Sequence, residues 1–215
     1  MIEVEQRLQQ LTNTLLTGNP EEAKQKTYAA LAIAKPNEVL DTIIETVNIL
    51  LDLNEVGGAD QSRFINLENN ANASLQAIED TLATTEGKFD FTTTVGPIGF
   101  TGGHLLSTVL AAFLRSVGFK AISLGKTQTA LEVLRNSEAL HADIVLPLLP
   151  RDDPISHMSN LQDLIQKGGY SAKFQVIPIA RGLPENVNLP LYAAKNIDEA
   201  ISKALEWAIK NSVAE

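Results

Sequence analysis

Cysteine is absent from this chain of 215 residues. Its absence excludes disulfides, thiolate zinc sites, iron–sulfur clusters and cysteine nucleophiles together. A chain without disulfides fits a reducing compartment, and we therefore expect a cytoplasmic protein.

Basic charge and long apolar runs are also scarce. The 26 acidic residues outnumber the 17 basic ones, which gives a formal net charge of -9. An acidic surface repels phosphate backbones and anionic lipids, so we expect no binding to nucleic acid or to a membrane. The apolar run from Ile144 to Leu149 is far shorter than the ~20 residues that span a bilayer. The charged N-terminal stretch MIEVEQRLQQL lacks a signal-peptide pattern.

The first part of the chain has the spacing of amphipathic helices. Hydrophobic residues make up 44% of the sequence, enough for an ordinary globular core. Asn19, Pro20 and Glu22 form a helix-start signal, with an N-cap, a proline in the first turn and a partner for a capping box. Four short-linked helices predict a small bundle. The predicted helices cover residues 2–17, 20–34, 36–56 and 59–82.

From residue 89 onward, short apolar strands alternate with helices. This alternation predicts a Rossmann-like α/β domain, with a five-stranded parallel sheet in flavodoxin-like order and helices on both faces. Ligands of such sheets bind beyond the carboxyl ends of the strands. The predicted strands are residues 89–95, 120–124, 143–148, 174–179 and 191–194, and the predicted helices are 102–117, 127–138, 155–167 and 197–212.

Two stretches of this second part, Gly118–Gly125 and Ala142–Val145, carry a resemblance to a known family. They are similar to the strand–helix–strand core of the cobalamin-binding corrinoid proteins of methyltransferase systems and of methionine synthase. Residues 18–53 also resemble the helical cap of that family. The resemblance implies a helical cap domain over 1–84 and a cobalamin-binding-like α/β domain over 89–215, with cobalamin or another tetrapyrrole as the cofactor.

Three sequence motifs of the family are altered in this chain. The family has Asp-x-His-x-x-Gly after the first strand, where the histidine ligates cobalt and the aspartate orients it. Here Pro97 stands at the aspartate position and Gly99 at the histidine position. The family's Ser-x-Leu appears as Pro147-Leu148-Leu149, and its Gly-Gly appears within Ile179–Gly182. The resemblance therefore implies a corrinoid held without the usual histidine.

The glycine-rich loop between the first strand and its helix is the main candidate site. Its glycines permit close backbone approach, and the following helix N-terminus favours an anion. It is neither a dinucleotide fingerprint nor a Walker loop. It either holds the phosphate or amide tail of a ligand or is a tight connection without one. The candidate residues in it are Gly96, Gly99, Phe100, Thr101, Gly102 and Gly103.

Further candidates lie at the same edge of the predicted sheet. His104 is either a metal ligand or a packed or surface histidine. Arg181 either pairs with a carboxylate of the ligand or closes the pocket. Leu148, Arg151 and Gly182 complete the predicted cofactor-binding set.

The loop after the third predicted strand adds Asp152 and His157, which together with Arg151 either contact the ligand or form a solvated charged loop. His141 is predicted to lie at the opposite edge, on the surface.

Sequence signals for catalysis are missing, since there is neither a nucleophile elbow nor an H-E-x-x-H segment. We therefore expect no independent enzyme. One hypothesis is a carrier or sensor that binds a corrinoid or related tetrapyrrole. The alternative is a divergent relative that has lost the corrinoid and acts as a regulatory or partner-binding protein. The expected partner is a methyltransferase, a regulatory protein or a second copy of the chain.

Overall fold

The computed structural model describes residues 2–55, 61–82, 88–100, 102–126, 128–181, 183 and 193–212. The chain divides into two compact units, and each is described by itself. The first unit comprises residues 1–86 with 115–118, and the second comprises 87–114 with 119–215. The predicted linker at 84–88 falls almost wholly outside the described residues, so the predicted domain limits stay a prediction.

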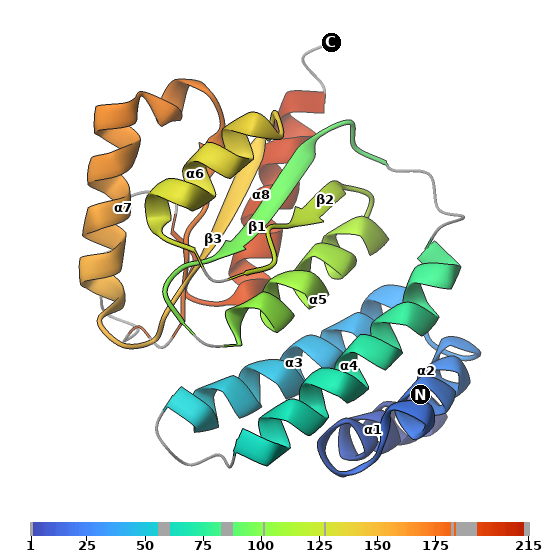
Figure 1. Cartoon of the computed structure of the whole chain (residues 1–215). Helices are drawn as coiled ribbons and strands as arrows, with labels where there is room; N and C mark the ends of the chain where they lie inside the picture. The colour runs from blue at the N-terminus through green and yellow to red at the C-terminus, as the bar shows by residue number, and fades with distance from the viewer. Residues whose placement is uncertain are drawn as a thin grey trace. The chain divides into compact units, whose positions relative to one another are not determined.

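The first unit contains four α-helices, as predicted (Figure 1). At the start of the second helix, the Asn19 Oδ1 accepts a hydrogen bond from the Glu22 backbone N–H at 3.1 Å, and Pro20 occupies the first helical position. That helix ends at Leu31, three residues before its predicted end. The helices are α1 (Ile2–Thr17), α2 (Pro20–Leu31), α3 (Pro36–Glu55) and α4 (Gln61–Leu82).

A buried polar side chain links α4 to the end of α1. The Asn70 side chain, only 1% exposed, donates from Nδ2 to the backbone carbonyls of Thr14, Leu15 and Gly18 at 3.0–3.2 Å. These carbonyls lie at or just beyond the C-terminal end of α1, where helical acceptors have no partner within the helix. Asn70 therefore supplies the donor that this helix end needs. The same unit has a core of fully buried apolar side chains, among them Leu11, Leu15, Leu40, Ile43, Leu51, Leu67 and Ile78.

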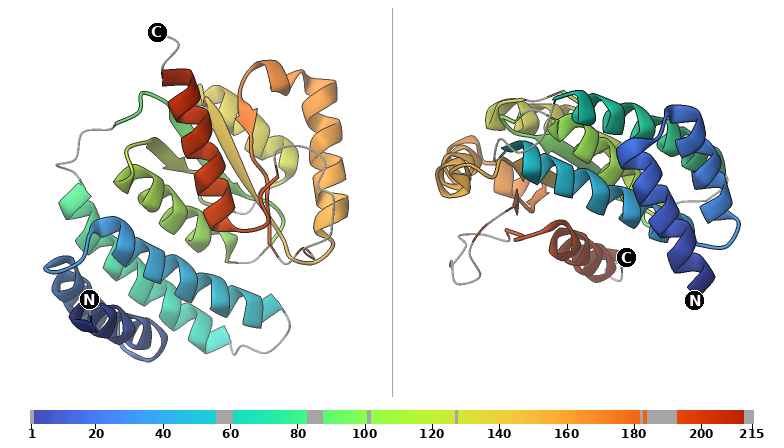
Figure 2. Two further views of the ribbon diagram at one scale, coloured as in Figure 1. Left: turned by 180° about the vertical axis from the view of Figure 1, so that it is seen from behind. Right: turned by 90° about the horizontal axis from the view of Figure 1, so that it is seen from below.

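The second unit is a parallel five-stranded sheet with helices on both faces, which confirms the predicted fold class (Figures 1 and 2). The strand order is β2-β1-β3-β4, and β5 also pairs with β3. The strands are β1 (Thr92–Pro97), β2 (Lys120–Ser123), β3 (Ile144–Leu149), β4 (Gln175–Val176) and β5 (Ile179–Ala180). The helices are α5 (Gly103–Ser116), α6 (Ala130–Ala139), α7 (Pro154–Gly168) and α8 (Ile197–Ser212), with a short 3₁₀ helix at Tyr170–Ala172.

Several strand boundaries differ from the prediction by one to three residues. Strand β1 begins at Thr92 rather than at Phe89. The two aromatic residues before it pack as rings, Phe89 against Phe119 at 4.9 Å and Phe91 against Trp207 at 5.1 Å between centroids. Both rings therefore pack within this unit, and the Phe91 carbonyl accepts a hydrogen bond from the Lys120 N–H of β2 at 3.2 Å.

The strand predicted at 174–179 is split into β4 and β5. Pro147 of β3 lies opposite the gap and has no N–H to donate to the Ile177 carbonyl. The register is unbroken, because Val145 pairs with Val176 and Leu148 with Ile179. The strand predicted at 191–194 lies largely outside the described residues, although Ala194 forms a parallel bridge with Ile179.

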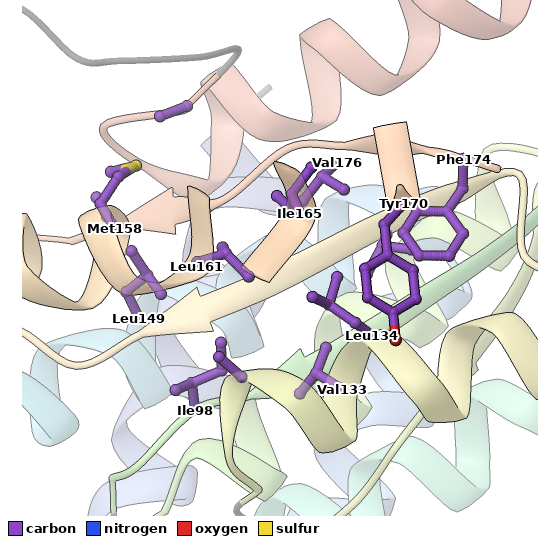
Figure 3. Close-up of a cluster of buried hydrophobic side chains, with 14 of the residues drawn as sticks. Ile98, Val133, Leu134, Leu149, Met158, Leu161, Ile165, Tyr170, Phe174 and Val176 are labelled. Atoms are coloured by element: carbon purple, nitrogen blue, oxygen red, sulfur yellow. The ribbon is translucent and has the colours of Figure 1, made fainter. Parts of the chain in front are cut away.

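Helices α6 and α7 cover one face of the sheet through a continuous apolar core (Figure 3). Side chains from both helices meet the face of β3 that carries Val145 and Leu149. Tyr170 and Phe174 close this core near the start of β4 as a stacked pair 5.7 Å apart. Besides Ile98, the other labelled members are Val133, Leu134, Met158, Leu161, Ile165 and Val176. In the part of the chain that the structure describes, no helix is both long and apolar enough to cross a bilayer.

Candidate ligand site at the carboxyl edge of the sheet

All strands of a parallel sheet end at the same edge. At this edge, backbone hydrogen bonds connect the loop after β1 to its neighbours on both sides. The N–H of Ile98 donates to the Leu148 carbonyl at 2.8 Å, which joins β1 to β3. On the other side, the N–H of Gly99 donates to the Gln128 carbonyl at 3.1 Å, and the N–H of Gln128 donates to the Pro97 carbonyl at 3.0 Å. The loop after β1 is therefore fixed between the loop after β2 and strand β3.

Two of the predicted loop glycines, Gly96 in β1 and Gly103 at the start of α5, are instead packed against the protein's own side chains. A Cβ atom on Gly96 would lie 2.9 Å from side-chain atoms of Leu124 and Val133. A Cβ on Gly103 would lie 2.6 Å from the Cβ of Pro97 and 2.7 Å from the Phe100 ring. Real Cβ atoms do not approach other atoms so closely, so glycine is required at both positions by packing rather than by a ligand.

Gly99, by contrast, faces open space. It has φ of +73°, and the only described atom within 4 Å of its Cβ position is the His157 Cε1, at 3.8 Å. Gly125, in the loop after β2, has φ of +71° and no described atom within 4 Å. Both glycines therefore leave backbone accessible on adjoining loops of the carboxyl edge.

An aromatic–cation pair also lies at this edge. The guanidinium carbon of Arg181, just after β5, lies 4.8 Å from the centroid of the Phe100 ring. Arg181 is 4% exposed and Phe100 is 6% exposed. A guanidinium over an aromatic face is attracted by the ring quadrupole. This contact therefore joins the loop after β1 to the chain leaving β5.

His157 is held in the first turn of α7 by an unusual cap. Asp153 has φ of +48° and accepts a hydrogen bond from the Ser156 N–H at 3.3 Å. Hydrogen bonds from Ser156 and, to a smaller extent, the charge of His157 lower the pKa of the Asp153 carboxyl. Asp153 thus carries negative charge beside a half-buried imidazole.

The other predicted residues occupy varied positions at this edge. Leu148 is fully buried in β3. Arg151 and Asp152 are exposed, and His104 is half-buried in the first turn of α5. Gly102 has φ of +81° at the start of that turn. Thr101 and Gly182 lie outside the described residues, so their predicted roles rest on the sequence alone.

A hydroxyl cluster at this edge was not predicted from the sequence. The Ser107 and Ser123 hydroxyl oxygens lie 2.8 Å apart, and the Gly125 N–H donates to the Ser123 Oγ at 3.1 Å. These hydrogen bonds connect Gly125, in the loop after β2, to Ser107 on α5 through the Ser123 hydroxyl. A polar residue at the end of an apolar strand was the one signal that could have indicated Ser123.

The opposite edge of the sheet carries a pocket of about 420 Å³. An ion pair between Lys173 and Glu138 lies in its wall. His141 also lines it and is exposed, with φ of +51°. His141 is therefore at the edge where the sequence placed it. The remaining lining residues are Ala142, Asp143 and Phe174.

Metal binding by the protein alone finds no support in the described ranges. Among these residues, no group of three or more His, Asp or Glu side chains is placed to hold an ion.

The fold of this chain is shared with a corrinoid protein of known structure. The monomethylamine corrinoid protein of Methanosarcina barkeri matches this chain with a TM-score of 0.70 and 12% sequence identity, over 94% of this chain and 99% of that one. At this identity the likeness establishes the shared fold.

Two weaker structural matches have scores too low to establish a shared fold. A cobalamin-binding protein from Desulfitobacterium hafniense DCB-2 is 12% identical, with a TM-score of 0.47 over 96% of this chain and 99% of that one. The methanol:cobalamin methyltransferase complex MtaBC from Methanosarcina barkeri is 15% identical, with a TM-score of 0.44 over 95% of this chain and 80% of that one. No protein-family model and no curated protein matches the sequence.

Proposed function

We propose that this protein binds a corrinoid or a related tetrapyrrole at the carboxyl edge of its sheet and acts as a carrier or sensor of that group. The observation that carries the proposal is the open backbone at Gly99, with the His157 ring as its nearest described neighbour, in a chain with a corrinoid-protein fold. Parallel α/β sheets bind ligands at this edge.

The chain's own residues would hold the macrocycle in three ways. Gly99 and Gly125 let a flat ligand approach the backbone, because neither has a side chain in the way. The N-terminus of α5 favours the phosphate or amide dipoles of a ligand tail. Arg181 adds a positive charge at the same edge. A bound corrinoid would supply the cobalt that carries a one-carbon group.

Retention of colour tests this proposal. The purified chain is incubated with hydroxocobalamin, methylcobalamin or haem, desalted, and its visible spectrum is recorded. We expect at least one of these ligands to stay with the protein at about one per chain. A protein that is colourless with all three would overturn the proposal.

The second candidate function is that of a relative that has lost the corrinoid and binds a regulatory partner. The burial of Arg181 against Phe100 favours it, because these side chains occupy volume at the edge that a ligand would need. Ligand retention separates the two candidates: if Phe100→Ala binds hydroxocobalamin and the natural chain does not, the ring closes the site.

The proposed carrier has no catalytic step of its own. A carrier needs an enzyme to load or unload it, and a methyltransferase is the partner class that the resemblance implies. Co-purification of an added methyltransferase with the loaded chain, but not with the unloaded chain, would support this partner.

A further inference from the structure

A histidine from another element, His157, lies close to position 99. Gly99 lies in the loop after β1, whereas His157 lies on α7, after β3. The His157 Cε1 nevertheless lies 3.8 Å from the place of a Cβ on Gly99. Cε1 is bonded to both ring nitrogens. Both nitrogens, which are the atoms that can bind a metal, therefore lie close to the exposed backbone of Gly99.

A carboxylate accompanies this imidazole. Asp153 caps the helix that carries His157, four residues earlier, and its charge interacts with the ring. Carboxylates beside metal-binding imidazoles raise the basicity of the ligand and help to fix its orientation. The Asp153 carboxylate, which accepts a hydrogen bond from the Ser156 N–H, thus supplies negative charge in the turn that carries His157.

The other two of the chain's three histidines lie farther from Gly99. His141 lines the pocket at the opposite edge of the sheet. His104 lies in the first turn of α5, and none of its atoms is within 4 Å of the Cβ position of Gly99.

We infer that His157 is the axial nitrogen ligand of the bound metal, supplied from α7 instead of from the loop after β1. The lone pair of one ring nitrogen forms the bond to the metal and one existing axial ligand leaves, so no oxidation or reduction is involved. This inference rests on the proposed function, and it identifies the residue that makes binding possible without a histidine at position 99.

Electron paramagnetic resonance of the full chain with cobinamide, a corrinoid without a nucleotide base, tests the inference. After reduction to Co(II), a nitrogen ligand below cobalt can come only from the protein. We expect each cobalt line to split into three with natural protein and into two with [¹⁵N]histidine-labelled protein. His157→Ala should abolish the splitting, and free imidazole should restore it. His141→Ala and His104→Ala should leave it unchanged.

The outcomes separate the two proposals. Retained cobinamide without nitrogen splitting, or splitting that survives in His157→Ala, overturns the role of His157 and leaves corrinoid binding intact. Splitting lost in His104→Ala assigns the ligand to His104 instead. If neither cobinamide nor any ligand of the colour test is retained, both proposals fall. Circular dichroism of each variant checks that the fold is preserved.

Discussion

The Arg181 guanidinium carbon lies 4.8 Å from the centroid of the Phe100 ring, and both side chains are buried. The two residues come from loops that follow different strands, β5 and β1. Their contact is thus a tertiary link at the edge where we propose the ligand binds.

We expect this pair to show a coupling energy in a double-mutant cycle. With Arg181→Met and Phe100→Leu, the interaction should be worth ~0.5–2 kcal/mol, the range of partly to fully desolvated cation–π contacts. Urea unfolding of the natural chain, both single variants and the double variant gives the value. Strictly additive effects would mean that the stacking adds nothing to stability.

Gly99 should be required for its backbone conformation and not for lack of space. Because φ is +73°, Gly99→Ala should lower the free energy of unfolding by ~1 kcal/mol, and Gly99→Asn by less, since asparagine tolerates left-handed backbone. Gly125→Ala is the matched control, with φ of +71° and no described neighbour within 4 Å. A much larger loss for Gly99→Ala than for Gly125→Ala would show that position 99 is not open.

Asn70 should be intolerant of a change that leaves its shape unaltered. Its Nδ2 donates to three carbonyls, and the carboxylate in Asn70→Asp would face them with acceptors only. We expect a loss of at least ~2 kcal/mol at pH 7, from the lost bonds and the buried charge. The control Asn72→Asp, at an exposed position of the same helix, should stay within ~0.5 kcal/mol. Equal effects of the two substitutions in chemical unfolding would contradict the role of the amide.

Glu199 should make stability depend on pH in the acid range. Its pKa is lowered by hydrogen bonds from the Lys195 backbone N–H and the Lys203 side chain. A depressed pKa in the folded state contributes stability above the ordinary carboxyl pKa, and this contribution is lost as pH falls through the folded value. The urea midpoints of the natural chain and Glu199→Gln should therefore differ at pH 7 and converge by about pH 3. The difference should be small, because the pair is partly solvated. A gap that widens in acid would have the wrong sign.

The sequence was sufficient where local chemistry decides structure. The strand–helix alternation predicted the parallel sheet, the predicted limits of the last helix match α8, and Asn19 caps α2 as its residue type suggests. The sequence was insufficient where a residue type suits both a strand and a packed core position. Phe89 is a good strand former that instead stacks on Phe119.

The candidate site depends mainly on contacts between distant residues. The glycine spacing after the first strand suggested a contact with a ligand. At Gly96 and Gly103, however, side chains of the protein itself fill the space beside the glycine. The short distance between His157 and Gly99 brings together α7 and the loop after β1, and no local sequence pattern encodes it. The left-handed cap at Asp153 that sets the start of α7 is likewise visible only in the fold.

Hydrogen exchange with and without hydroxocobalamin is the most direct measurement of the central claim, that the carboxyl edge binds the ligand. Peptides over residues 96–104 and 148–157 should exchange more slowly when the ligand is present. Peptides over 138–143 and 170–174, at the opposite edge, should not change. Protection confined to that opposite edge, or no protection anywhere, would contradict the account.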